Sequence, residues 1–213
     1  MKYPILYSFK RCPYAMRARM SLKLADIKCE LREVRLSNKP NHMLEVSPKG
    51  TVPVLILEDK VIDESIEIIN WVLEQNNIFE GNLSEDQEAY SENMIKLFDY
   101  KFKFHLDRYK YASRYEDSDE VEHRIECVKI LYELEKNLSN QAWFFGEKIN
   151  KLDIAILPFL RQFRIANPKW FDEELGSKKV KKYLHKFIES NLLRDVMIKY
   201  EVWHEDSALS YFP

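Results

Sequence analysis

The chain has two hydrophobic patterns in succession, and the first is replaced by the second near Glu80. Before this residue, short apolar segments alternate with turns, and after it, apolar residues recur at helical spacing over longer stretches. The elements expected before the change are strands over 3–9, 29–36, 52–57 and 60–62 and helices over 13–26, 41–46 and 65–75. A strand–helix–strand unit followed by a hairpin and a closing helix predicts a small mixed sheet with helices on both faces.

The part of the chain after the change predicts a helical bundle. Apolar stripes at helical spacing run through 87–113 and 121–138, and no stretch after Glu85 is typical of a strand. The polar residues between the two patterns, which include Gly81, predict a connector. We therefore expect one domain over residues 1–77, a linker over 78–86 and an all-helical domain over 87–213.

One helix start in the second part is specified in detail. Asn150 and Asp153 have the spacing of a capping box, in which each side chain accepts a hydrogen bond from the other residue's backbone N–H. The run over 154–163 that follows is almost wholly apolar, which predicts a helix central to the bundle and bent at Pro158.

Composition excludes several classes of function. The 33 basic and 35 acidic residues give a net charge of −2, which provides no general attraction for nucleic acid or anionic lipid. Four glycines cannot be placed in a phosphate-binding or dinucleotide-binding loop, and the five histidines show no metal-ligand spacing. No apolar run approaches the roughly 20 residues that span a bilayer, and the N-terminus lacks the pattern of a secretory signal. We expect a cytoplasmic protein that binds no nucleic acid, membrane or metal.

The candidate chemistry lies at Cys12, where a predicted strand passes into a predicted helix. Pro13 is favoured at the first helical position, which puts Cys12 at or beside the N-cap. Free backbone N–H groups and the helix dipole there favour a thiolate, and Lys10, Arg11 and Arg17 add positive charge. We therefore expect a nucleophilic cysteine. The alternative is a buried and inert one.

The other residues around this position determine which thiol chemistry is expected. Ala15 stands where a dithiol oxidoreductase has its second cysteine, so an external thiol must release Cys12 from a mixed disulfide. Glutathione is the abundant candidate in a reducing compartment. Cys29 and Cys127 are expected to be small core residues, since three cysteines are too few for a disulfide framework.

Three motifs together resemble the thioredoxin-like half of a glutathione transferase. They are Cys12-Pro-Tyr-Ala after a strand, Gly50-Thr-Val-Pro53 before an apolar strand, and Asp63-Glu-Ser65 at a helix start. The cysteine motif is similar to the Omega-like and Lambda-like classes, and the second half is similar to the helical domain of that superfamily. The resemblance implies an α/β thioredoxin-like N-terminal domain, an all-α C-terminal domain and a homodimer.

The resemblance also implies that glutathione binds as a co-substrate beside Cys12. Pro53 would be cis and would turn the Val52 backbone toward the cysteinyl part of glutathione, where it could pair like an added strand. Tyr14 would contact the ligand beside the cysteine.

A second set of implied contacts would hold the two ends of glutathione. Ser65 and Glu64 would bind the carboxylate and the ammonium of the γ-glutamyl group. Lys39 would reach the glycyl carboxylate or the nearby backbone. Taken alone, Glu64-Ser65 is also an ordinary helix start and Lys39 an ordinary surface lysine.

Three functions remain open. The first is a glutathione-dependent thiol transferase or reductase, in which Cys12 forms a mixed disulfide and the partner is a small or protein-bound thiol, disulfide or electrophile. The second is conjugation of glutathione to electrophiles, with Tyr7 or Ser8 as the hydroxyl that stabilises the glutathione thiolate. The third is a binding module of the same fold without enzymatic activity.

Overall fold

The computed structural model describes residues 3–79, 83–116 and 119–213. The chain folds into two compact units, one formed by Met1–Ile78 together with Ser190–Pro213 and the other by Phe79–Glu189. The linker expected over 78–86 includes residues 80–82, which lie outside the described residues.

The first unit contains a five-stranded sheet in the order β4-β3-β1-β2-β5. The strands are β1 (Ile5–Ser8), β2 (Cys29–Glu33), β3 (Val54–Ile56), β4 (Val61–Ile62) and β5 (Tyr211–Phe212). β1 pairs in parallel with β2, and the other neighbours are antiparallel. Every residue of β3 is buried, because helices cover both faces of the sheet there.

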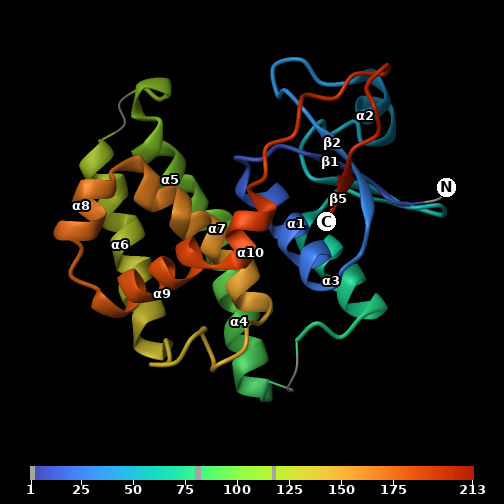
Figure 1. Cartoon of the computed structure of the whole chain (residues 1–213). Helices are drawn as coiled ribbons and strands as arrows, with labels where there is room; N and C mark the ends of the chain where they lie inside the picture. The colour runs from blue at the N-terminus through green and yellow to red at the C-terminus, as the bar shows by residue number, and fades with distance from the viewer. Residues whose placement is uncertain (1–2, 80–82, 117–118) are drawn as a thin grey trace. The chain divides into compact units, whose positions relative to one another are not determined.

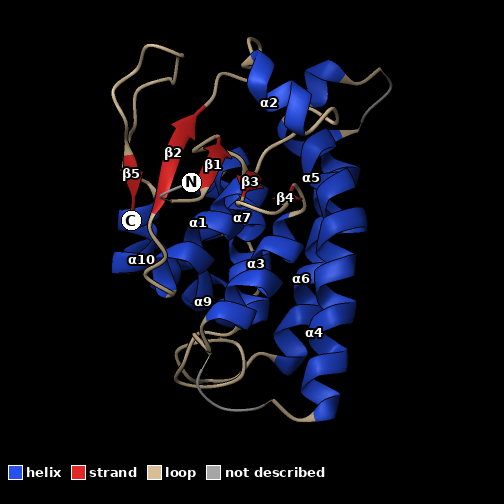
Figure 2. Ribbon diagram, turned by 90° about the vertical axis from the view of Figure 1, so that its right-hand side faces the viewer, coloured by secondary structure: helices blue, strands red, loops and turns tan. Residues whose placement is uncertain are grey.

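The described residues of this unit form four helices: α1 (Pro13–Leu24), α2 (Asn41–Val46), α3 (Ser65–Gln75) and α10 (Asn191–Val196). α1 and α3 lie on one face of the sheet and α2 on the other, as Figures 1 and 2 show. α1 packs against both α3 and α10. The expected mixed α/β arrangement with a thioredoxin-like order of elements is confirmed.

The C-terminal end of the chain differs from the sequence-based prediction. Ser190–Pro213 groups with the first unit rather than with an all-helical domain over 87–213. β5 pairs with the edge of β2, through Cys29 and Phe212. The expectation that no strand follows Glu85 is therefore wrong, because a two-residue strand is too short to produce a period-2 pattern.

The second unit consists of helices and loops in its described residues, as Figure 2 shows. They are α4 (Glu85–Leu97), a π-helical segment (Phe98–Phe102), α5 (Lys103–Lys110), a 3₁₀ turn (Ala112–Arg114), α6 (Glu120–Asn137), α7 (Lys151–Ala166), α8 (Pro168–Glu173) and α9 (Lys178–Glu189). α7 is the most buried of them and contacts α4, α5, α8 and α9. The predicted central helix is thus confirmed.

The start of α7 has the capping box that the sequence predicts. The Asn150 side chain accepts hydrogen bonds from the N–H groups of Leu152 (2.9 Å) and Asp153 (3.3 Å). The fully buried Asp153 carboxylate accepts from the N–H of Asn150 (2.8 Å), the N–H of Phe144 (2.9 Å) and the hydroxyl of Tyr183 (2.6 Å). This carboxylate therefore joins α7, the loop before it and α9.

Burial raises the pKa of Asp153 from 3.8 to about 7, although these hydrogen bonds oppose the shift. Since the folded-state pKa lies above the unfolded one, stability from this group is complete below about pH 4 and is lost as the pH rises through about 7. We expect the free energy of unfolding of the wild type to fall relative to that of Asp153→Asn between about pH 4.5 and about pH 8. Urea unfolding followed by circular dichroism measures both curves, and parallel curves would contradict the prediction.

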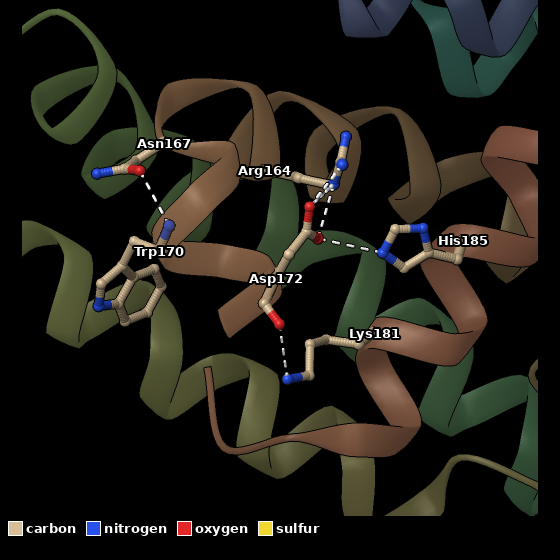
Figure 3. A network of polar contacts seen from close by, with 6 residues as sticks. All are labelled: Arg164, Asn167, Trp170, Asp172, Lys181 and His185. Carbon is tan, nitrogen blue, oxygen red and sulfur yellow. Dashed lines mark hydrogen bonds and ion pairs between the residues drawn. The ribbon is translucent and has the colours of Figure 1, made fainter. Parts of the chain in front are cut away.

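A second polar network in this unit is centred on Asp172 of α8 and is shown in Figure 3. Arg164 of α7 donates to both carboxylate oxygens, at 2.9 and 2.6 Å, and the His185 ring of α9 lies 3.1 Å from one of them. Lys181 donates to the backbone carbonyl oxygen of Asp172 at 3.2 Å. The network is partly exposed, which distinguishes it from the fully buried Asp153 carboxylate.

Candidate active site

Cys12 is the N-cap residue of α1. Its backbone is extended (φ −75°, ψ 125°), and Pro13 is the first helical residue. The Cys12 N–H donates to the carbonyl of Phe9 at 2.9 Å, and its carbonyl accepts from Met16 at 3.0 Å. The side chain is half-buried, and the thiol donates to the backbone oxygen of Val52 at 3.7 Å. The predicted position at a helix start is confirmed.

The segment opposite the thiol is the turn that leads into β3. The Val52–Pro53 peptide bond is cis, as the resemblance implied. Gly50 in this turn has a φ of +63°, which favours glycine. A Cβ on Gly50 would lie 3.6 Å from Nζ of Lys39 and 3.2 Å from Cδ2 of Leu44, so the Lys39 side chain lies directly against the turn.

The start of α3 brings together two further residues from the predicted set. Ser65 is the first residue of α3 and is buried, and its Oγ accepts a hydrogen bond at 3.2 Å from the fully buried Arg17. Glu64 is the N-cap, and its carboxylate accepts from the Lys49 ammonium at 2.6 Å. Lys49 also donates to the backbone oxygen of Asp63 at 2.9 Å. Sequence reasoning missed these roles of Arg17 and Lys49, because no spacing in the sequence links them to α3.

Tyr14 lies on the first turn of α1, two residues after the thiol. Its ring is half-buried, and the Arg17 guanidinium lies 5.3 Å from the ring centroid. This contact connects Tyr14 to Ser65 through Arg17. The structure thus brings Cys12 next to the turn at Val52, and Tyr14 next to the contacts at the start of α3.

Comparison with known proteins agrees with this arrangement. Residues 6–81 match the family model described as the N-terminal domain of glutathione S-transferase. The probable glutathione S-transferase parA of Nicotiana tabacum is 31% identical over 163 residues, which cover 75% of this chain and 72% of the relative. The chain belongs to the glutathione transferase family.

Two further comparisons support the assignment to the glutathione transferases. Glutathione S-transferase omega-1 of Rattus norvegicus is 29% identical over 163 residues, covering 74% of this chain and 66% of the relative. The crystal structure of the Tau class glutathione S-transferase of Mangifera indica is 26% identical, with a TM-score of 0.79 over 93% of this chain and 94% of that chain.

Two hydroxyl groups near the end of β1 of this glutathione transferase, those of Tyr7 and Ser8, form hydrogen bonds within the protein. The fully buried Tyr7 hydroxyl accepts from Arg32 at 2.7 Å and lies 2.8 Å from Nδ1 of His42, and burial raises the pKa of Tyr7. The Ser8 hydroxyl accepts from Nε of Arg19 at 2.8 Å. Both hydroxyls therefore already contact partners within the first unit.

The other two cysteines of this glutathione transferase are core residues, as predicted. Cys29 and Cys127 are both fully buried. Burial raises the pKa of the Cys29 thiol to about 12 and also raises that of Cys127. Cys12 is thus the one cysteine of the three that is partly exposed.

Neither a candidate metal site nor a candidate membrane-spanning helix is found over residues 3–79, 83–116 and 119–213 of this glutathione transferase. No cluster of three or more His, Cys, Asp or Glu side chains there has the grouping of a metal site. None of the helices in those ranges combines the length and the apolar character that crossing a membrane requires.

Proposed function

We propose that this glutathione transferase is a thiol transferase or reductase of the cysteine type, similar to the Omega-like and Lambda-like classes. The observation that carries the proposal is the half-buried Cys12 thiol at the N-cap of α1, 3.7 Å from the Val52 carbonyl oxygen. The N–H groups at the start of α1 and the helix dipole favour the thiolate over the thiol. A thiolate in this position is a nucleophile.

The reaction consists of two exchanges at Cys12. The thiolate attacks the glutathione sulfur of a glutathionylated thiol, so that a Cys12–glutathione disulfide forms and the substrate leaves as a thiolate, which takes up a proton. A second glutathione, as its thiolate, then attacks the glutathione sulfur of the mixed disulfide. This step forms glutathione disulfide and restores the Cys12 thiolate. In sum, the substrate is reduced by two electrons and two glutathione molecules are joined in one disulfide.

Glutathione is proposed to dock along the turn that precedes β3. The backbone of Val52, held by the cis bond to Pro53, offers polar groups to the cysteinyl part of the ligand. Tyr14 borders the thiol on α1, and Lys39 lies against the same turn as Val52. The partly exposed Lys39 ammonium provides a positive charge for the glycyl carboxylate.

The γ-glutamyl group is proposed to bind at the start of α3. The Glu64 side chain does not cap α3, so the first N–H groups of this helix, together with Ser65, can receive a carboxylate. Glu64 provides the negative charge for the ammonium of the ligand. Lys49 already pairs with Glu64, at 2.6 Å. Docking of glutathione therefore places both the Lys49 ammonium and the ammonium of the ligand near the Glu64 carboxylate.

The contacts of Tyr7 and Ser8 favour this reaction over conjugation. Conjugation requires a hydroxyl directed at the bound glutathione thiol, but Tyr7 contacts Arg32 and His42, and Ser8 accepts from Arg19. The partly exposed group at the helix start is the Cys12 thiol. The physiological partner is then a thiol, disulfide or electrophile, either small or carried by a protein.

Replacing Ala15 with cysteine tests the proposed single-cysteine mechanism. Ala15 lies on the first turn of α1 at the spacing of a dithiol motif, so we expect Ala15→Cys to form an internal disulfide with Cys12. Incubation with glutathione disulfide followed by mass spectrometry of the intact chain then yields one glutathione adduct on the wild type. In the variant the adduct is replaced by the loss of two hydrogen atoms.

The matched control is Ala142→Cys, because Ala142 is also buried but lies in the second unit. This variant should keep the wild-type adduct at Cys12. A wild-type chain that gains no glutathione, or an Ala15→Cys variant that keeps its adduct as the wild type does, would contradict the proposed mechanism.

A further inference from the structure

A buried ion pair joins α1 to β2 in the first unit. Nη2 of Arg19 pairs with Oε2 of Glu33, and the two residues are 1% and 8% exposed. Buried opposite charges are costly unless their remaining donors and acceptors are also satisfied. The other contacts of the two side chains therefore indicate what the pair holds in place.

Two of these contacts lie on the segment that carries Cys12. Oε1 of Glu33 accepts a hydrogen bond at 2.7 Å from the backbone N–H of Lys10, which precedes the thiol in the β1–α1 turn. Nε of Arg19 donates at 2.8 Å to Oγ of Ser8, the last residue of β1. The pair thus holds this segment at the end of β1 and again in the β1–α1 turn.

The C-terminal segment contacts both residues, Arg19 through its side chain and Glu33 through its backbone. Nη1 of Arg19 donates to the carbonyl of Val196 at 3.1 Å, at the end of α10. The Glu33 carbonyl accepts from the N–H of Trp203 at 2.8 Å. The C-terminal segment therefore completes the surroundings of the pair and helps to exclude water from it.

We propose that the Arg19–Glu33 pair positions the Cys12 thiol by fixing the β1–α1 turn, while the opposite charges of its two members cancel at the sulfur. The inference rests on the proposed function, in which Cys12 is the nucleophile. Arg19 and Glu33 act through the turn and are positioning residues.

The charges give the pair a signature that a purely structural contact lacks. Arg19 is two helical turns from Cys12, about 10 Å along the axis of α1. A unit charge at that distance shifts a pKa by about 1 at the effective dielectric of protein interiors. Removing Arg19 alone leaves a negative charge near the thiol, and removing the Glu33 charge alone leaves a positive one.

The experiment measures the pH dependence of Cys12 alkylation by iodoacetamide in the full chain, read at residue 12 by mass spectrometry. We expect Arg19→Met to raise the thiol pKa and Glu33→Gln to lower it, each by about 1, and the double variant to return close to the wild type. The control is the partly exposed pair of the second unit, disrupted in Arg164→Met, which should leave the pKa unchanged.

Glu33→Asp separates position from charge. It keeps the carboxylate but withdraws it by one methylene from the N–H of Lys10. We expect an unchanged thiol pKa and unchanged alkylation by the small reagent, with about 10-fold slower formation of the mixed disulfide with glutathione disulfide. That reaction requires the sulfur to meet a docked ligand at a defined position.

Shifts in the same direction for Arg19→Met and Glu33→Gln, or no shift in either folded variant, would overturn the inference. If Arg19→Met or Glu33→Gln does not fold, as judged by circular dichroism, Glu33→Asp is the deciding variant. Formation of the mixed disulfide with glutathione disulfide at the wild-type rate in Glu33→Asp then overturns the inference. A wild type that alkylates but forms no mixed disulfide refutes the proposed function instead, while the opposed pKa shifts still decide the inference.

Discussion

Cys12→Ser is expected to lower glutathione-dependent thiol transfer by at least about 1,000-fold, because it removes the nucleophile of both exchange steps. A serine hydroxyl remains protonated at neutral pH and cannot form a disulfide. The measurement is the rate of glutathione disulfide formation from a glutathionylated peptide and glutathione, together with the mass of the intact chain. The variant should carry no glutathione adduct.

The control for this variant is Cys127→Ala, since Cys127 is fully buried in the second unit. It should keep the rate and the adduct of the wild type. Calorimetric titration of Cys12→Ser with glutathione should still detect binding, because the contacts proposed at Val52, Glu64 and Ser65 are intact. Substantial thiol transfer by Cys12→Ser would refute Cys12 as the nucleophile.

Asp153→Ala should lower the free energy of unfolding by about 3–5 kcal/mol, the largest stability effect we expect from one substitution. The carboxylate accepts from two backbone N–H groups and from the Tyr183 hydroxyl in a site without solvent access. Each donor left without a partner costs about 1–3 kcal/mol. Chemical denaturation followed by far-UV circular dichroism measures the loss.

Asp172→Ala is the matched control in the same unit. Asp172 also accepts several hydrogen bonds, but its carboxylate is partly exposed, and water replaces lost partners there. Its loss should cost about 1 kcal/mol or less. Equal losses in the two variants would show that burial of the Asp153 carboxylate does not determine the effect.

Local sequence patterns were enough to predict the parts of the fold and site that depend on neighbouring residues. The Cys12 N-cap follows from Pro13 at the first helical position, and the capping box follows from the spacing of Asn150 and Asp153. The cis bond at Pro53 came from the resemblance to a known family. These features involve residues within one turn or one motif.

The features that the sequence did not predict depend on contacts between distant segments. Lys49 pairs with Glu64, and Arg19 pairs with Glu33, across different elements of the first unit. Charged residues are expected at the surface, so burial of Arg19 contradicts the usual preference. The contact of β5 with β2 joins residues far apart in the chain through two residues only.

The placement of Ser190–Pro213 has a consequence for synthesis of the protein. The first unit needs α10 and β5, which leave the ribosome after the whole of the second unit. Domains generally fold as units, with the N-terminal one first. In this chain the synthesis of the interrupted unit begins before that of the second unit and ends after it. The second unit, which is continuous in sequence, can fold in between. Until α10 and β5 have left the ribosome, the edge of β2 lacks its neighbouring strand and the Arg19 guanidinium lacks its contact with Val196.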